Sequence, residues 1–259
     1  MALAVAAPAA ASDAGSVTHN AADVSATAEW DRGDNLGITN PRLFVVRAGV
    51  RYDITIVDIC DEGCVLVPDD AATKPGRSIL KVADLDGDGE PEVLIDTFSG
   101  GAHCCVATRM LTWNGSGYTP TDTAWRDVGY ELRDADGDGR QELVGYDPRF
   151  SEAFTYFAAS SFPRLVLQVD NGGFADATRR FGKIVALDAK AQLADLRRAA
   201  RRRQDVRGIL AAYVADLYNL GKRATASREL DRQRAQGRIS KGFKRLLLRR
   251  LAAWGYPVA

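Results

Sequence analysis

The chain has 259 residues, of which 46% are hydrophobic and 26% are charged, with 24 glycines and 9 prolines. This composition is that of a globular protein and excludes a collagen-like or wholly disordered chain. Lysine plus arginine equal aspartate plus glutamate at 34 each, so the net charge of the whole chain indicates no particular partner. No apolar run approaches the roughly 18 residues that a membrane-spanning helix needs, so no transmembrane segment is expected.

The charge is distributed unevenly along the chain. Residues 1–178 contain 13 basic and 28 acidic residues, a net charge of −15. Residues 179–259 contain 21 basic and 6 acidic residues, a net charge of +15. This asymmetry indicates two domains with different tasks, or one domain that screens the charge of the other.

The first eleven residues are short, apolar and rich in alanine, with small residues at Ala9 and Ala11 that suit a signal-peptidase site. No positively charged region precedes them, so a disordered alanine-rich leader is the alternative. Residues 12–34 are small and polar and are predicted to be flexible. We therefore assign residues 1–40 to a signal-like leader with a flexible lead-in, and expect a secreted or cell-envelope protein.

Residues 41–178 show the period-two alternation and the β-branched residues typical of strands, with turn signals at residues 114–117 and 171–173. The predicted strand regions are residues 43–67, 79–96, 104–113, 129–132, 142–146 and 165–169. Residues 179–259 carry apolar residues at helical spacing instead. The predicted helices are residues 188–203, 205–220, 224–236 and 240–254, with Gly208, Gly221, Gly237 and Gly255 as kinks or stops. The predicted class is α+β multidomain, with an antiparallel all-β domain followed by a basic helical domain.

The strongest functional signal is a nine-residue loop, Asp-x-Asp-Gly-Asp-Gly-x-x-Glu, that occurs at residues 84–92 and again 50 residues later at 134–142. The glycines at positions 4 and 6 permit the tight backbone that brings carboxylates together. Oxygen ligands in this number suit Ca²⁺ better than Mg²⁺, and position 7 would offer its backbone carbonyl. The predicted ligands of two calcium sites are Asp84, Asp86, Asp88, Glu90, Glu92, Asp134, Asp136, Asp138, Arg140 and Glu142.

These loops are not EF-hands, which need an acidic residue at position 12. Position 12 is Ile95 in the first loop and Gly145 in the second. Without a cation, the carboxylates are expected to repel one another and raise each other's pKa values, which would leave the loop loose. The alternative is that both loops are acidic turns that hold no metal, and two copies with the same acid at position 9 weigh against it.

The strand-loop-strand pattern resembles the FG-GAP or VCBS-type repeats of the integrin α-chain propeller and of many secreted bacterial proteins. Residues 171–178 (Asn-Gly-Gly-Phe-Ala-Asp-Ala-Thr) are similar to a segment of those repeats. The resemblance covers residues 79–178 and implies calcium at the tip of each hairpin. Closed propellers usually have at least four blades, and this chain has two clear loops. The resemblance therefore implies an incomplete propeller or a small sandwich of two or three blade-like units.

Four cysteines, Cys60, Cys64, Cys104 and Cys105, are an even number in a chain expected to be exported, which favours disulfides over free thiols. Three pairings are possible, and the sequence leaves them open. A zinc site in which His103 joins the thiolates is a competing interpretation, although the usual Cys-x-x-Cys pairs are missing. A Cys/His nucleophile at residues 103–105 would indicate a secreted hydrolase or redox enzyme, but no third orienting group is evident.

Two weaker patterns remain. Arg32-Gly33-Asp34 matches the tripeptide that integrins recognise, but three-residue strings often arise by chance. The basic residues of 197–203 and 241–250 are either a solvated helical face, a face docked on the acidic domain, or a site for a cell-envelope polyanion. An exported protein is not expected to bind nucleic acid. The leading hypothesis is a calcium-dependent binding or adhesion-type module of the cell envelope, with structural calcium, no catalytic step, and a cell-envelope or extracellular ligand.

Overall fold

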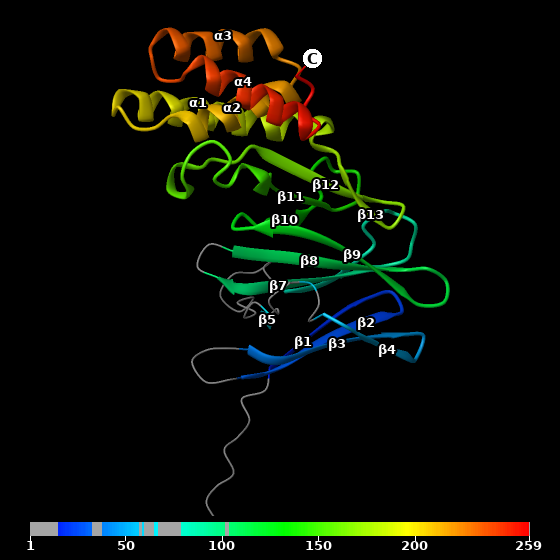
Figure 1. Cartoon of the computed structure of the whole chain (residues 1–259). Coiled ribbons are helices and arrows are strands. Elements are labelled where there is room, and N and C mark those ends of the chain that lie inside the picture. The colour runs from blue at the N-terminus through cyan, green and yellow to red at the C-terminus, as the bar shows by residue number, and fades with distance from the viewer. Residues whose placement is uncertain are drawn as a thin grey trace, which may run out of the picture. The chain divides into compact units, whose positions relative to one another are not determined.

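The computed structural model describes residues 15–32, 38–56, 59, 65–66, 79–101 and 104–258. This part of the chain forms three antiparallel sheets followed by four α-helices (Figure 1). The predicted α+β class, with an all-β region before a helical region, is confirmed.

The first sheet is a four-stranded meander in which each strand pairs with the next along the chain. Its strands are β1 (Gly15–Ala21), β2 (Val24–Arg32), β3 (Ile38–Arg47) and β4 (Val50–Ile54). Val24, Ala26 and Ala28 alternate along β2 and are almost fully buried. The prediction of a flexible lead-in was therefore wrong for residues 15–32. Alanine contributes little to an apparent hydrophobic pattern, but its methyl group is enough to fill a sheet face when the partner sheet supplies larger side chains.

The second sheet is built around the long strand β7, against which β6 and β5 pair along one edge and β8 along the other. Its strands are β5 (Val65–Leu66), β6 (Leu80–Ala83), β7 (Glu92–Gly101), β8 (Cys104–Trp113) and β9 (Tyr118–Arg126). The predicted turn at 114–117 joins β8 to β9, where the Oδ1 atom of Asn114 accepts backbone N–H bonds from Ser116 and Gly117, both at 3.0 Å. One hydrophobic core contains side chains from both the first and the second sheet, among them Ala26, Val45, Val93 and Leu111.

The third sheet is a second four-stranded meander. Its strands are β10 (Tyr130–Arg133), β11 (Glu142–Tyr146), β12 (Arg164–Asp170) and β13 (Gly173–Asp176). Asn171 and Gly172 adopt φ values of 50° and 71° between β12 and β13, as a two-residue turn between antiparallel strands requires. This is the turn that the Asn-Gly-Gly signal predicts.

The helices are α1 (Gly182–Arg201), α2 (Arg207–Asn219), α3 (Arg223–Ala235) and α4 (Lys241–Ala253). Nearly every residue of α2 from Leu210 to Tyr218 is buried, which makes it the central helix of the group. Helix α1 begins six residues before the predicted start at Asp188. That aspartate resembles a helix cap in the sequence, but it is buried in the helix and pairs with Arg164.

The described residues divide into two compact units. The first unit contains the first two sheets apart from the last three residues of β9, and the second contains residues 85–87 and 124–259, with the third sheet and all four helices. Phe150 and Phe154, which precede β12, belong to the same hydrophobic cluster as Leu210 and Leu247 of the helices. The predicted boundary at residue 178 therefore does not separate two compact units. The third sheet and the helices belong to the same unit, in which Ile184 of α1 packs against a cluster that contains Val144 of β11 and Val166 of β12.

Candidate metal-binding loops

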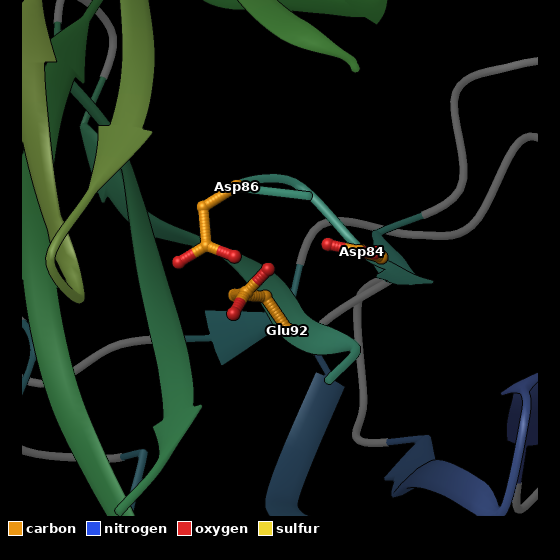
Figure 2. Close-up of side chains that lie close together, drawn as sticks. All are labelled: Asp84, Asp86 and Glu92. Carbon is orange, nitrogen blue, oxygen red and sulfur yellow. The ribbon is translucent and has the colours of Figure 1, made fainter. Parts of the chain in front are cut away.

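The first acidic loop joins β6 to β7. Carboxylate oxygens of Asp84, Asp86 and Glu92 all lie within 4.8 Å of one another. Figure 2 shows these three carboxylates turned toward a common space, with Glu92 at the start of β7 and the two aspartates on the loop before it. Positions 1, 3 and 9 of the motif are thus brought together, as the sequence predicts.

The second acidic loop joins β10 to β11 and repeats this arrangement. Carboxylate oxygens of Asp134, Asp136 and Glu142 also lie within 4.8 Å of one another. In both loops the glycines at positions 4 and 6 have positive φ angles, between 78° and 94°. Non-glycine residues rarely adopt this conformation, so the glycines are what allows the two loop aspartates and the glutamate at the start of the next strand to converge.

Backbone amides already stabilise the negative charge of the second loop. Asp134 accepts hydrogen bonds from the N–H groups of Gly137 at 2.6 Å and Gly139 at 3.0 Å. These bonds hold the pKa of the Asp134 carboxyl below its ordinary value. The expectation that mutual repulsion raises the pKa values was therefore wrong for Asp134. In the first loop, Asp84 accepts the corresponding N–H of Gly89 at 3.0 Å.

The position-9 glutamates are the buried members of the two groups. Glu92 is 1% exposed and Glu142 is 0% exposed. The carboxylate of Glu142 is held at both oxygens, by the N–H of Ala135 at 2.9 Å and by the Nε2 atom of Gln168 at 2.9 Å. Gln168 was not among the predicted site residues. Its only signal in the sequence is a polar residue inside the apolar strand 165–169.

The side chains of the remaining predicted ligands make other contacts. Asp88 and Asp138, at position 5, accept the N–H of the position-7 residue at 2.7 and 2.9 Å, and belong to neither group of converging carboxylates. The side chain of Glu90 forms an ion pair with Arg47. The side chain of Arg140 donates from Nη2 to the carbonyl oxygen of Val169 at 3.2 Å. Both position-7 side chains thus contact other strands, and the prediction that the backbone carbonyl of this residue is a metal ligand stays a prediction.

The geometry of the two groups fits a calcium ion. Two oxygens that both bind Ca²⁺ at about 2.3–2.6 Å are at most about 5 Å apart. All three carboxylate oxygens of each group lie within 4.8 Å of one another, so each pair is close enough to bind the same ion. Three carboxylates leave further coordination positions, which backbone carbonyls and water commonly fill in calcium sites.

Several predicted features fall on parts of the chain that the structure does not describe. Cys60, Cys64 and His103 lie outside the described residues, as do Gly33 and Asp34 of the tripeptide. Only the backbone of Cys104 and Cys105, at the start of β8, is described. The disulfide pairing, the zinc interpretation and the Cys/His nucleophile therefore stay predictions.

The basic residues of the helical region are partly paired within it. Arg198 forms an ion pair with Asp195 on the same helix, and Lys244 pairs with Asp231 at 2.6 Å across two helices. Arg250 donates to the backbone carbonyl of Ala153. These side chains therefore make contacts that hold parts of the second unit together, and they also contribute positive charge to its surface.

Two relatives share part of this sequence. The chain is 32% identical over 154 residues to a probable thylakoid lumen protein of Synechocystis sp., covering 56% of this chain and 44% of the relative. It is 36% identical over 88 residues to an uncharacterized protein of Sinorhizobium fredii, covering 34% of this chain and 14% of the relative. The chain thus spans less than half the length of each. No protein-family model matches the chain, and no solved structure matches it.

Among the described residues, none of the helices combines the length and the apolar character needed to cross a membrane.

Proposed function

We propose that this protein is an exported, FG-GAP-like binding module in which each of the two acidic loops holds one structural Ca²⁺ ion. The observation that carries the proposal is the convergence of the same three motif positions, 1, 3 and 9, in both loops. One acidic turn with close carboxylates is common on protein surfaces. Two turns that are 50 residues apart and repeat the same spacing, the same glycine conformations and the same buried glutamate support a shared ligand.

Calcium would join the two strands of each hairpin. In the first loop it would tie Asp84 and Asp86 to the beginning of β7, and in the second it would tie Asp134 and Asp136 to the beginning of β11. Binding to the folded state alone stabilises that state, by about 2.7 kcal/mol per site when the free ion is at 100 times its Kd. The role of the ion is to fix strand register, so the proposed activity of the protein is binding and includes no catalytic step.

Export is supported by the alanine-rich start and by the compartment named for the Synechocystis relative, a probable thylakoid lumen protein. Calcium sites of extracellular modules often bind with Kd values of about 10⁻⁴–10⁻³ M. A site with only a few charged ligands is enough for an affinity in this range. We place the protein at the cell envelope or outside the cell, with an envelope ligand as its partner.

Calorimetric titration with Ca²⁺ after chelation tests the two sites. The unaltered protein is expected to bind two ions and to melt at a higher temperature once they are bound. Asp86→Ala should remove one site and Asp136→Ala the other, because each removes a ligand oxygen together with its charge. Asp127→Ala is the matched control, since Asp127 is exposed and belongs to neither loop.

Two outcomes would overturn the calcium assignment. One is the absence of saturable heat with the unaltered protein. The other is retention of both sites in the Asp86→Ala, Asp136→Ala double variant. Capture of the protein on isolated envelope fractions, with and without chelator, then tests whether the binding role depends on calcium.

A further inference from the structure

A cavity of about 400 Å³ lies beside the second acidic loop, in the second unit. Its lining includes three arginines from two parts of the chain. Arg140 comes from the loop between β10 and β11, and Arg179 and Arg180 come from the short 3-10 helix Thr178–Arg180 that follows β13. Three guanidinium groups around one small cavity concentrate positive charge in a region whose neighbouring loop is strongly acidic.

The two acidic residues in the lining have partners beside them in the chain. Asp176 accepts hydrogen bonds from the backbone N–H and the hydroxyl of Thr178, the first at 2.9 Å. Asp170 accepts from the side-chain amide of Asn171 at 3.1 Å. Neither carboxylate forms an ion pair with the three arginines among the described residues, so these acids do not neutralise the guanidinium groups directly.

The arginines keep donors available. Arg140 is anchored by Nη2 to the carbonyl of Val169, and its buried Nε atom has no hydrogen-bond partner among the described residues. Arg180 is anchored by Nη1 to the side-chain oxygen of Gln168. Within the described part of the chain, no hydrogen bond or ion pair engages the guanidinium of Arg179. The exposed guanidinium of Arg179 can therefore donate to a ligand oxygen, and hydrogen bonds between charged partners are stronger than neutral ones.

We infer that this cavity is a binding site for an oxyanion, meaning a phosphate or carboxylate group of a small ligand. Guanidinium groups present paired N–H donors that match the oxygens of both groups, and such charge-assisted bonds are stronger than neutral ones. Arg140 and Arg180 are held in place by their own contacts, so they are pre-positioned for the ligand. Arg179, which is exposed, completes the set when the ligand arrives.

An adjoining cavity gives the ligand room for an organic part. It has a volume of about 290 Å³, shares Asp176 and Arg179 with the first, and is also lined by Trp254 and Tyr256. A ligand whose oxyanion contacts Arg179 therefore lies next to a second cavity that has aromatic side chains in its lining. Among phosphate-bearing probes, an ester is therefore expected to bind at least as tightly as the inorganic ion.

Calorimetric titrations at low ionic strength test this inference with three probes: inorganic phosphate, glycerol 3-phosphate and succinate. Saturable binding of one equivalent by at least one probe is expected, and the tightest probe identifies the preferred group. Because the site is built from arginines, titrations of protein freed of metal on a chelating resin keep its outcome separate from that of the calcium proposal, without adding a soluble carboxylate that would compete with the probes.

Arg179→Gln is the first variant, because the exposed side chain has no contact in the described structure whose loss would unfold the protein. The affinity of this variant for the tightest probe is expected to fall about fivefold to tenfold, since a hydrogen bond between charged partners is lost. Arg140→Gln should weaken binding at least as much. Arg201→Gln is the matched control, since Arg201 is exposed, ends α1 and is not in the lining of the cavity. It makes the same charge change and should leave the affinity for the probe unchanged.

The inference is overturned if none of the three probes binds saturably. It is also overturned if Arg179→Gln and Arg140→Gln both bind as tightly as the unaltered protein, or if Arg201→Gln weakens binding equally, because the attraction would then come from net charge and not from this cavity.

Discussion

Asp216, on the central helix α2, is a carboxyl group with 0% exposure. Its Oδ1 atom accepts the backbone N–H of Arg164 at 3.1 Å, and the neighbouring Asp188 accepts from Nη2 of the same arginine at 3.2 Å. Burial, followed by the charge of Asp188, raises the pKa of Asp216 to about 9. Asp216 is therefore protonated at neutral pH in the folded protein, where it can donate to Asp188.

This pKa makes stability depend on pH. The unfolded chain titrates near 3.8 at this position and the folded chain near 9, so the folded state holds a proton that the unfolded state has lost between these values. The contribution to stability is complete below about pH 4 and is lost progressively up to about pH 9, by at most about 1.4 kcal/mol per pH unit. Asp216→Asn should reduce the dependence of the free energy of unfolding on pH, because the amide keeps the shape and the donor of the protonated carboxyl without titrating. Urea unfolding between pH 5 and 9 measures this dependence, and an unchanged dependence in the variant would contradict the assignment.

The motif spacing predicted the convergence of positions 1, 3 and 9 at each loop, but it also included position 5, which belongs to neither group, and it did not show what holds the residues in place. The glycine conformations and the three convergent positions follow from a local pattern of nine residues. The contact of Gln168 with Glu142 joins residues 26 positions apart on neighbouring strands. Contacts of that range depend on strand register, which a local pattern does not contain.

Helix α2 contains a glycine whose role is packing. A Cβ atom on Gly208 would collide with the carbonyl oxygen of Ala159 and lie 3.0 Å from the Cγ2 atom of Thr155. Gly208→Ala is therefore expected to destabilise the protein by about 1–3 kcal/mol, although alanine favours helices. Thermal unfolding measures the change.

Gly242→Ala provides the matched control within α4. A Cβ atom there meets only the Oγ atom of Ser240, at 3.5 Å, so the substitution should be neutral or stabilise by up to about 1 kcal/mol. Equal effects of the two substitutions would contradict the packing role of Gly208.

The helices were more predictable than the first strands. Gly221, Gly237 and Gly255 follow the ends of α2, α3 and α4 with positive φ angles, and glycine after an apolar stripe is a strong local stop signal. Gly208 was predicted to be a kink or stop, but it lies inside α2. The glycine is needed there because Ala159 comes close to it, and Ala159 is too distant in the sequence for a local pattern to show this contact. Strands β1 and β2 were missed since their small residues gain burial only from another sheet.

The arrangement of the whole molecule predicts what happens when the helices are removed. A chain that ends at residue 178 would expose Phe150 and Phe154, which are 1% and 6% exposed in the full protein. It would also remove Asp188, the partner of Arg164. We expect the third sheet to lose its protection from amide hydrogen exchange in this truncated chain, while the first two sheets keep theirs. Protected amides in β11 and β12 would show instead that the helices are a separate unit.

The boundary between the units could not be read from charge. Net charge changes sign near residue 178 because it reports the surface, where most charged side chains lie. The units are defined by shared cores, and the core of the second unit joins Phe150 to helix residues about 60 and 100 positions later, such as Leu210 and Leu247. Composition along the chain therefore located a real change in secondary structure, but not a division between compact units.

The two acidic loops differ at position 7, where Glu90 pairs with Arg47 and Arg140 reaches the carbonyl of Val169. Glycine and aspartate shape each loop from within, whereas position 7 and the buried position-9 glutamate depend on the surroundings, as the bond from Gln168 to Glu142 shows. A protein engineer who grafts the motif onto another hairpin must therefore redesign the position-7 side chain and supply a polar partner for the glutamate.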